Sequence, residues 1–424
     1  MRDLLPVEAR QQARLSGRLS DVFALHGYER VVVPVFEYAS IFEGGSGELG
    51  PDELMRFVEP DTGEIVALRP DMTPQVARLL TAHLGALSLP ARLCYQGSVL
   101  RRRRERARRN RQVPQAGVEL VGLSGQAGDL EVVELAVHAM RGSGLTDFVL
   151  DLSHAKIAGS LLDLASEPYR APLAEALLHK DRAELERQSA EAHLDRAHCQ
   201  ALVGIAELHG GAELWPRAEA LLSGTVCEPG LRELWALWEK LRQLVGSGRV
   251  VVDLGEPRNL SYYTGTTFQI LADGPGEAVV SGGRYDGLYS RFGADHPAAG
   301  FAVDLDNLHW ALSALGEVDP APIKLLICPA PDFRAEVAEE LSRRLRGAGI
   351  SNAMLSHGDP GSYARAWGYS HIVHLAQAGG RLVDVGSGRV ESLDCSNAEA
   401  MASAMRRRWL DVRSQPPFTG AAEK

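Results

Sequence analysis

Cysteine is scarce in this sequence, and the few cysteines are too scattered for joint chemistry. Five occur in 424 residues, and no two form a C-x-x-C pair: Cys94, Cys199, Cys227, Cys328 and Cys395. Neither a disulfide framework nor a zinc ribbon is therefore indicated. The histidines offer no better metal site, because no paired spacing with carboxylates occurs around His154, His193, His198 and His209. We expect reduced thiols, no metal and no cofactor.

The sequence also lacks a long apolar run and an excess of positive charge. No stretch approaches the roughly 20 apolar residues that a membrane span needs. Near the start, Pro6, Glu8 and Arg10 interrupt the apolar segment that a signal peptide would require. The net charge is −10, whereas proteins that bind nucleic acid generally are usually basic. We therefore expect a cytoplasmic protein that contacts neither nucleic acid nor membrane.

What is present is the composition of a large globular protein. Hydrophobic residues make up 45% and charged residues 24% of the chain, and its length favours two or three domains. Helical spacing predicts helices over residues 8–27, 76–84 and 132–141, and an unbroken helical pattern without strand signals over 157–246. The strand patterns lie at residues 28–34, 56–58, 65–68, 92–100, 115–123, 147–152, 249–254, 266–271 and 277–281. A strand–helix unit is expected over 300–315.

Four segments, taken in order, resemble the histidyl-tRNA synthetase family. They are RDLLP at residues 2–6 with the helix-to-strand unit at 27–34, LRPDMT at 68–73, the segment 97–122, and RNLSYYTG at 258–265 combined with SGGRYDG at 281–287. The first is similar to the dimer-forming motif 1 of that family, and the third to its motif 2. The last pair is similar to the signatures of histidine-recognising members. The resemblance extends from residue 1 to about 315.

Two departures from the family pattern affect the positions that serve ATP. Arg103 occupies the position of a motif 2 glutamate, two residues after Arg101. In motif 3, the terminal arginine of GFAxGLER is replaced by Asn307, and Asp304 stands where the family has glycine. Asparagine cannot replace a delocalised cation that binds phosphate oxygens in a bidentate manner. We therefore expect the synthetase activity to be lost and no catalytic residue to remain.

The phrases LRPDMTPQVAR at residues 68–78 and PQAGVELVG at 114–122 are similar instead to regulatory subunits of ATP phosphoribosyltransferase, which are paralogues of the synthetases. Histidine recognition is then implied to survive. The positions that match the family's histidine pocket are Asp71, Thr73, Arg101, Gln115, Glu119, Arg258, Tyr262 and Tyr263. Asp71 is one methylene shorter than the family's glutamate.

The resemblance also implies a role for each of these residues. Asp71 and Thr73 would accept hydrogen bonds from the ammonium group of histidine. Gln115 and Glu119, which share one face of a strand, would serve the ammonium and the imidazole N–H. Arg101 and Arg258 would pair with the carboxylate, while Tyr262 and Tyr263 would wall the imidazole.

Structural alternatives exist for several of these positions. Asp71 can equally be a turn or N-cap residue, and Gly282-Gly283 a strand bulge. Because neighbouring strand residues point to opposite faces, we expect at most one residue of the pair Tyr262 and Tyr263 to line the pocket directly. The Arg-rich run 101–111 is compatible with a phosphate-rich ligand, a partner subunit or plain solvation. Asp286 is expected to be structural.

The resemblance implies an α+β fold: a class II aminoacyl-tRNA synthetase-like antiparallel sheet core with a helical insertion, plus a small C-terminal α/β domain. The expected parts are a core at 1–156 and 247–315, the insertion at 157–246, a linker at 316–322, a degenerate anticodon-binding-like domain at 323–412 and a disordered tail at 413–424.

The implied function is that of a non-catalytic regulatory subunit. It would associate with the short-form catalytic subunit of ATP phosphoribosyltransferase in the first step of histidine biosynthesis, and would confer feedback inhibition by histidine. A homodimer of this chain is also expected. Two alternatives are an active histidyl-tRNA synthetase and an RNA-binding paralogue that uses the Arg-rich run.

Overall fold

The computed structural model describes residues 3–43, 54–83, 88–101, 111–257, 262–316, 323–394 and 397–410. The chain divides into two compact units, with the division between residues 318 and 319. Within the described residues, none of the helices combines the length and the apolar character needed to cross a bilayer.

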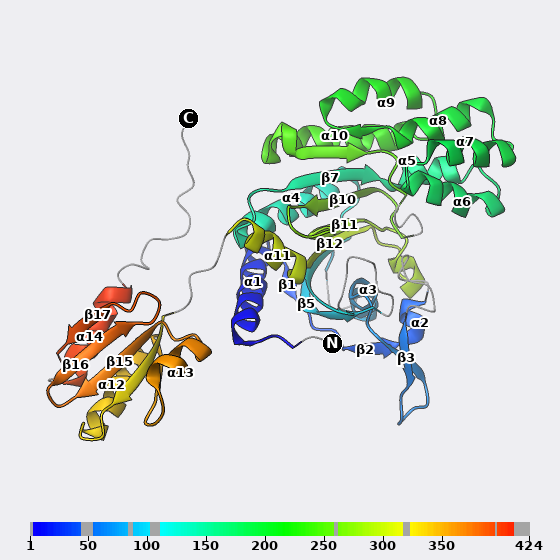
Figure 1. Ribbon diagram of the computed structural model, residues 1–424. Coiled ribbons are helices and arrows are strands. Elements are labelled where there is room, and N and C mark those ends of the chain that lie inside the picture. The colour runs from blue at the N-terminus through cyan, green and yellow to red at the C-terminus, as the bar shows by residue number, and fades with distance from the viewer. Residues whose placement is uncertain are drawn as a thin grey trace. The chain divides into compact units, whose positions relative to one another are not determined.

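A mixed, mostly antiparallel nine-stranded sheet organises the first unit (Figure 1), in the order β1-β5-β6-β12-β11-β10-β7-β9-β8. Among the described strands of this sheet, only the pairs β1–β5 and β7–β9 are parallel. The strands are β1 (Glu29–Arg30), β5 (Ala91–Leu100), β6 (Gln112–Val121), β7 (Val149–His154), β8 (His209–Gly210), β9 (Val250–Asp253), β10 (Thr266–Leu271), β11 (Val280–Arg284) and β12 (Ala298–Asp304).

One face of this sheet is covered by α1 (Pro6–Leu25), α4 (Gly125–Ser143) and α11 (Leu305–Ala314). Leu15, Leu19 and Phe23 recur at a four-residue spacing, so α1 presents one apolar stripe to the sheet. The helix gives way to strand at Gly27, whose φ of +79° suits glycine. Apolar residues at alternate positions of β6, among them Val118, complete this core.

The opposite face carries α3 (Thr73–His83) and the short 3-10 helix η4 (Tyr289–Phe292). A second apolar cluster joins Val76 and Leu80 of α3 to Tyr95, Val113 and Tyr289. Beside it lies a three-stranded sheet in the order β2-β4-β3, made of β2 (Phe36–Tyr38), β3 (Met55–Val58) and β4 (Ile65–Leu68), with the short helix α2 (Ala39–Phe42). The two faces of the large sheet thus belong to different cores.

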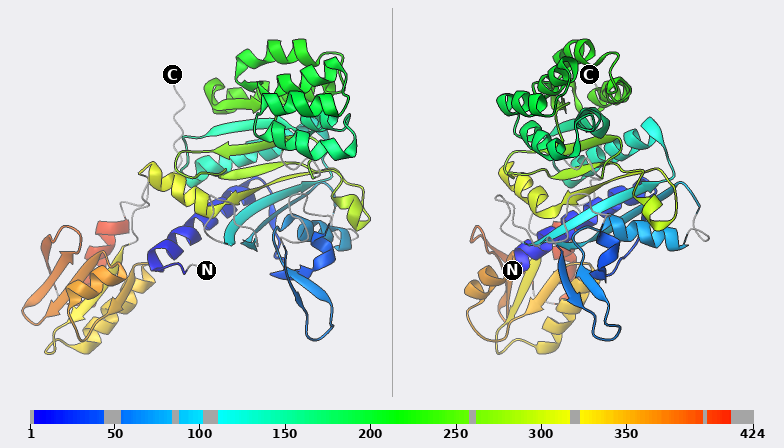
Figure 2. Two further views of the ribbon diagram at one scale, coloured as in Figure 1. Left: turned by 45° about the vertical axis from the view of Figure 1, so that its right-hand side comes forward. Right: turned by 90° about the vertical axis from the view of Figure 1, so that its right-hand side faces the viewer.

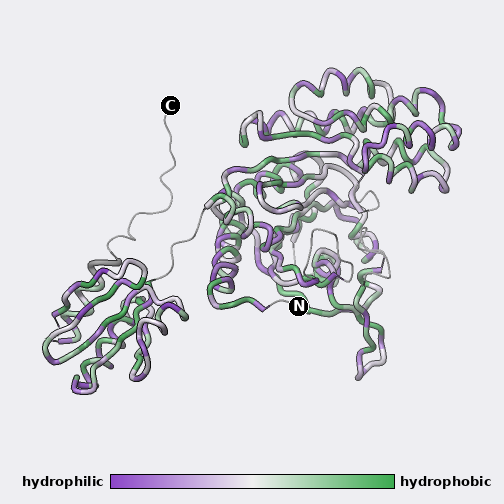
Figure 3. Tube along the Cα trace, viewed as in Figure 1, coloured by the Kyte–Doolittle hydropathy of each residue, from purple (hydrophilic) through white to green (hydrophobic). Residues whose placement is uncertain are grey.

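A group of helices packs beside the β7–β9–β8 end of the large sheet (Figure 2). Hydrophobic and hydrophilic residues alternate along these helices, as they do in amphipathic helices (Figure 3). Their bounds are α5 (Ala155–Leu162), α6 (Glu167–Leu178), α7 (Arg182–Glu191), α8 (Arg196–Ala206), η2 (Ala212–Leu214), α9 (Trp215–Leu222), α10 (Glu228–Val245) and η3 (Ser247–Arg249). The segment is helical as expected, except that the two-residue strand β8 interrupts it.

The second unit is a five-stranded sheet with three helices. Its strand order is β14-β13-β15-β16-β17, parallel at β14–β13–β15 and antiparallel beyond. The elements are β13 (Lys324–Pro329), α12 (Ala335–Gly347), β14 (Ser351–Met354), α13 (Pro360–Trp367), β15 (His371–Ala376), β16 (Gly379–Asp384), β17 (Val390–Leu393) and α14 (Ala398–Leu410).

Several expected boundaries were wrong. The strand predicted at 28–34 is reduced to Glu29–Arg30, because Pro34 cannot donate a ladder hydrogen bond. The strand predicted at 277–281 is instead Val280–Arg284, since the Gly-Pro-Gly turn before it continues further than the alternation suggested. Most of the expected linker, at residues 317–322, and the expected tail at 413–424 lie outside the described residues.

Candidate functional site

The candidate site lies on the α3 side of the large sheet, around β6. Side chains alternate along a strand, and Ala116, Val118 and Leu120 turn toward α1 and α4. Gln115 and Glu119 therefore face α3, and both are buried. A carboxylate only 1% exposed requires polar partners in this part of the molecule.

Thr73, the first residue of α3, supplies the central polar contact. Its side chain lies close enough to those of Glu119, Tyr95 and Tyr262 to influence the pKa of each of them. The backbone N–H of Thr73 donates to Oδ1 of Asp71 at 3.3 Å. Asp71 is thus placed at the start of the helix, as the turn or N-cap alternative foresaw, and its carboxyl also remains within the polar cluster.

The electrostatics of the two carboxyls are dominated by burial. Desolvation raises the pKa of Glu119 well above its usual range, and the nearby charge of Asp71 raises it further. Burial likewise raises the pKa of Asp71, while the guanidinium of Arg101 and hydrogen bonds from Thr73 oppose that rise. Oε2 of Glu119 is buried and has no hydrogen-bond partner among the described residues. Oε2 of Glu119 can therefore accept a hydrogen bond that no described group of the protein donates.

Three tyrosines form one wall of the cluster. The ring of Tyr262 stacks on Tyr285 at 5.1 Å between centroids and meets Tyr263 edge-on at 5.0 Å. Residues 262 and 263 lie outside any strand, so the expectation that only one of them can reach the pocket was based on the wrong local structure. Tyr262 contacts Thr73, while the ring of Tyr263 lies 2.9 Å from the position a Cβ would take on Gly283.

Glycines on β11 and β12 make room for this wall. A Cβ on Gly300 would lie 2.7 Å from Oε2 of Glu119 and would clash with the hydroxyl of Tyr285. Gly283 on β11 is equally crowded by Tyr263. These positions need glycine because side chains from both sides close over the strands. Gly283 lies within regular β11–β12 pairing, so the bulge alternative is not what the structure has there.

The remaining expected residues are less closely assembled. Gln115 lies four residues from Glu119 on β6, about 14 Å along the strand, and the hydroxyl of Tyr95 occupies the space over Gly117 between them. Arg101 acts on Asp71 electrostatically, and its Nε is buried without a hydrogen-bond partner in the described parts of the chain. Arg258 lies outside the described residues, as do Arg103 and the rest of the run 102–110.

Two site residues were missed by the sequence reasoning, Tyr95 and Tyr285. Tyr95 is paired with Gly117 on β6 and reaches across it into the cluster. Tyr285 follows the Gly-Gly-Arg of the fourth segment, and its hydroxyl is buried without a partner within the described chain. The pairing of a tyrosine with a glycine on the neighbouring strand could have revealed Tyr95. Recognising this pair requires knowledge of the register between β5 and β6.

The motif 3 positions have structural partners of their own. Oδ1 of Asp304 accepts hydrogen bonds from the backbone N–H groups of Asp306 at 2.9 Å and Asn307 at 3.0 Å, so Asp304 is the N-cap of α11. The amide of Asn307 donates to the carbonyl oxygen of Ala278 at 2.9 Å. A helix N-terminus that already holds a carboxylate is a poor binding site for phosphate.

Arg284 connects the segment at residues 281–287 to α4 through hydrogen bonds. Its Nε donates to Oδ1 of Asp129 at 2.6 Å and its Nη1 to Oδ1 of Asp286 at 2.9 Å. Thr266 donates to the other oxygen of Asp129 at 3.1 Å. Asp286 also accepts from the N–H of Ala298 at 3.0 Å, which is the structural role expected of it. This network fixes the strand end that carries Tyr285.

The part of the chain that the structure describes contains no group of three or more His, Cys, Asp or Glu side chains suited to a metal ion. What the cluster can bind follows from its chemistry. Buried carboxyls, hydroxyls and aromatic faces together suit a small ligand that carries a cation and an N–H-bearing ring.

Comparisons with known proteins show which chains resemble this one in sequence and fold. The family model described as histidyl-tRNA synthetase matches residues 1–308. A protein from Syntrophotalea carbinolica described as an ATP phosphoribosyltransferase regulatory subunit is 34% identical over 404 residues, covering 93% of this chain and 94% of that protein. One of the same description from Anaeromyxobacter dehalogenans is 44% identical over 317 residues, covering 74% and 90%.

A solved structure from Bacillus halodurans C is described as an ATP phosphoribosyltransferase regulatory subunit/histidyl-tRNA synthetase. It matches with a TM-score of 0.76 at 26% identity and covers 88% of this chain and 96% of its own. The expected α+β fold with a class II synthetase-like sheet core is thereby confirmed.

Proposed function

Because the chain belongs to the family of ATP phosphoribosyltransferase regulatory subunits, within the histidyl-tRNA synthetase-like proteins, we propose that it makes a short-form catalytic subunit both active and sensitive to histidine. The catalytic subunit joins ATP to phosphoribosyl pyrophosphate in the first step of histidine biosynthesis. This chain would complete the active assembly without contributing a catalytic residue.

The observation that carries the effector part of the proposal is the pair formed by the partly buried Asp71 and the fully buried Glu119 around Thr73. Both carboxyls have raised pKa values because they are desolvated. An ammonium group or an imidazolium bound between them would supply the missing positive charge and donate to the unpaired Oε2 of Glu119. Histidine carries both of these groups.

The other functional groups of histidine have plausible partners nearby. The stacked Tyr262 and Tyr285 present aromatic surface to an imidazole ring. The guanidinium of Arg101, whose Nε is buried without a partner among the described groups, would face the carboxylate. Gln115 and Arg258 belong to the same proposal, as residues at the edge of the ligand.

The synthetase alternative is disfavoured by Asp304 and Asn307. Adenylate formation needs ATP held by its phosphates, and at these positions the chain has a helix-capping carboxylate and an amide bonded to Ala278. Histidine-dependent ATP–pyrophosphate exchange should therefore be absent from the purified protein. Exchange at a measurable rate would support the synthetase function instead.

Feedback inhibition requires that histidine bind the active and the inhibited assembly with different affinities. Such coupling commonly amounts to about 1–3 kcal/mol, or roughly 5- to 150-fold. The coupling is reciprocal, so the catalytic subunit must change the affinity of this chain for histidine by the same factor.

The test is to titrate histidine into complexes reconstituted with the catalytic subunit while measuring phosphoribosyl-ATP formation. Three versions of this chain are compared: wild type, Glu119→Gln, and the matched control Glu175→Gln, which changes an exposed glutamate on α6. Glu119→Gln keeps the shape but removes the charge, so half-inhibition should require about ten- to a hundredfold more histidine. Uninhibited activity should not change.

If the Glu119→Gln complex follows the wild-type inhibition curve, the effector binds elsewhere and this part of the proposal fails. If the catalytic subunit is fully active without this chain, the assembly part fails independently.

A further inference from the structure

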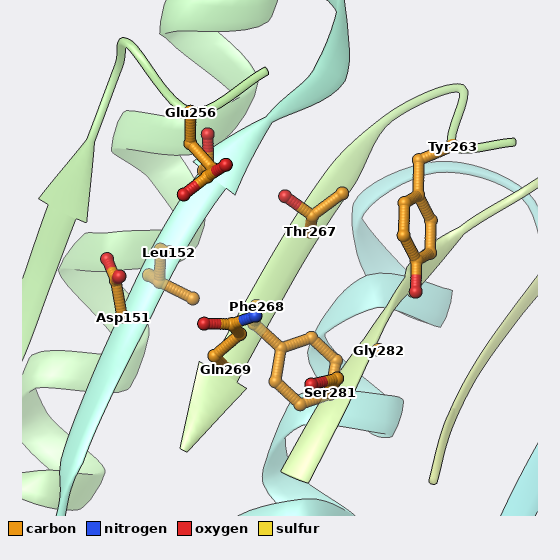
Figure 4. A pocket seen from close by; sticks show the side chains of 10 residues that line it. Asp151, Leu152, Glu256, Tyr263, Thr267, Phe268, Gln269, Ser281 and Gly282 are labelled. Atoms are coloured by element: carbon orange, nitrogen blue, oxygen red, sulfur yellow. The ribbon is translucent and has the colours of Figure 1, made fainter. Parts of the chain in front are cut away.

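Two features of the fold could hold a further ligand: a pocket over β7, β10 and β11 (Figure 4) and a pair of histidines between the end of α1 and α4. The pocket encloses about 450 Å³, part of it open to solvent. Two carboxylate residues line it, Asp151 and Glu256, but both already have interactions of their own, so their charge does not indicate what binds there. The histidine pair has a more definite geometry.

The two imidazole rings approach each other through their nitrogens. His26 follows the last residue of α1, and His138 lies in the second half of α4. Nε2 of His26 is 3.2 Å from Nδ1 of His138, and the ring centroids are 5.2 Å apart. Two nitrogens that each lie about 2.0–2.1 Å from one tetrahedral zinc ion are themselves about 3.3 Å apart. The pair therefore has the nitrogen separation that a shared metal ion requires.

The backbone holds both histidines in place. The N–H of His26 donates to the carbonyl oxygen of Phe23 at 3.1 Å, and the next residue, Gly27, ends the helix with a φ of +79°. His138 is fixed on α4 beside the fully buried Val137. Because the two backbones are positioned by the fold, binding an ion requires only rotation of side chains, and little conformational entropy is lost.

A proton shared between the rings is the alternative to a metal ion. One imidazole then donates and the other accepts, because a neutral imidazole has one N–H and one lone pair. Burial, followed by the charge of His26, lowers the pKa of His138, which favours the neutral form that ligates metals. When both rings carry their proton on the nitrogen that faces away, two lone pairs are available to one ion.

The surroundings of the pair indicate the kind of ion. Glu134 lies one helical turn before His138 and its charge raises the pKa of that imidazole, whereas the charge of Arg141 lowers it. The described residues contain no group of three or more His, Cys, Asp or Glu side chains suited to a metal ion, so the pair supplies two ligands and water the others. Imidazole ligands favour zinc, copper or nickel over magnesium and calcium, which prefer oxygen.

We propose that His26 and His138 form a binding site for a divalent transition-metal ion, zinc above all, coordinated by two imidazoles and by water. The two residues are 112 positions apart in the sequence, so the expectation of no metal, which was based on spacing along the chain, could not take this pair into account. The site lies on the face of the large sheet that α1 and α4 cover, opposite the proposed histidine site, and does not depend on that proposal. A bound ion would fasten the end of α1 to α4.

The probe is Zn²⁺, titrated into the full chain and followed by calorimetry in a buffer that does not chelate metals. Saturable binding to wild type is expected, and Mg²⁺ should not compete. His26→Gln and His138→Gln each leave a single imidazole and should weaken zinc binding by at least the loss that removal of a second-shell partner causes, about ten- to a hundredfold. His209→Gln, which changes an exposed histidine on β8, is the matched control and should bind zinc as wild type does.

A second measurement is the midpoint of thermal unfolding. Zn²⁺ should raise it for wild type and for His209→Gln, but not for His26→Gln or His138→Gln. Circular dichroism without zinc checks that the variants fold, and the exposed position of His26 makes its replacement the safer of the two. Glu119→Gln should bind zinc as wild type does, which separates this site from the one proposed for histidine.

Two results would each overturn the proposal. If wild type shows no saturable binding of Zn²⁺, the two rings share a proton and nothing else. If both histidine variants keep the wild-type affinity for Zn²⁺, the ion binds at another place on the chain.

Discussion

The negative charge of Asp71 raises the pKa of Glu119, although the two residues come from different elements. The beginning of α3 and the middle of β6 are thereby brought into one electrostatic unit. Two neighbouring carboxyls, of which Glu119 is fully and Asp71 partly buried, resist simultaneous ionisation. A bound cation removes that resistance, so ligand binding and proton release are coupled.

The affinity for histidine should rise with pH. In the ligand-free protein the raised pKa of Glu119 keeps its carboxyl protonated above the ordinary value of 4.5, and a protonated carboxyl cannot pair with a cation. As the pH rises through this raised pKa, the proton no longer has to be displaced. Calorimetry at several pH values should show proton release on binding to wild type and a weaker pH dependence for Glu119→Gln. Because the titration of histidine itself is common to both proteins, identical slopes would contradict the coupling.

The free energy of unfolding of the ligand-free Glu119→Gln variant should increase relative to that of wild type as the pH rises. A folded-state pKa above the unfolded one means that the contribution of Glu119 is fully present below the unfolded pKa and is lost as the pH rises through the folded pKa. Each unit of such elevation corresponds to about 1.4 kcal/mol. Urea unfolding at pH 5 and pH 8 should show the variant gaining on wild type at the higher pH. If wild type instead becomes more stable relative to the variant between pH 5 and pH 8, Glu119 is ionised and paired in the folded protein.

The chain should form a homodimer through the segment around β2. Val32, Val35 and Phe36 are exposed there, Val32 to 77%, and exposed apolar patches of this kind mark interaction surfaces. Light scattering should give twice the chain mass of 45.9 kDa. The double variant Val32→Asp/Phe36→Asp should be monomeric at micromolar concentration. The control Val390→Asp, on exposed strand β17, should stay dimeric, and a monomeric wild type would refute the idea.

Arg284→Ala should destabilise the fold by about 3–5 kcal/mol, because it leaves the buried carboxylate of Asp129 without its cation. Arg291→Ala, which removes an exposed arginine a short distance along the chain, should change the free energy of unfolding by less than about 0.5 kcal/mol. Denaturant unfolding monitored by circular dichroism distinguishes the two. Equal effects would mean that the Asp129 network contributes little.

The sequence alone predicted which residues of β6 face the site, but it did not predict how the surrounding tyrosines are arranged. The two-residue period of β6 correctly put Gln115 and Glu119 on one face, since Ala116 and Val118 belong to the opposite core. The same rule failed for Tyr262 and Tyr263, because it was applied to residues that lie outside any strand. Tyr95 was missed because its relation to Gly117 depends on the register of β5 against β6, which no local pattern encodes.

The strands of the second unit differ in how clearly the sequence indicates them. Strands β13 and β15 are buried and strongly apolar, so they stand out in the sequence. The strands β14 and β17 contain no fully buried residue. They are extended because they hydrogen-bond with the neighbouring strands β13 and β16. Pairing partners in a sheet are distant in sequence, and short half-exposed strands therefore give little signal of their own.

The capping of α11 couples two positions of the sequence. Oδ1 of Asp304 accepts from the backbone at the beginning of this helix, and the amide of Asn307 donates to the carbonyl oxygen of Ala278 before β11, so both side chains have structural roles. Asn307→Arg alone would remove the bond to Ala278 and set the new cation beside the Asp304 carboxylate. Asp304→Gly alone would remove the cap at a cost of a few tenths of a kcal/mol. A chain that acquired glycine at position 304 and arginine at position 307 one at a time would therefore pass through an intermediate in which the beginning of α11 is less well satisfied. The two positions are expected to be epistatic, because the effect of changing one depends on which residue occupies the other.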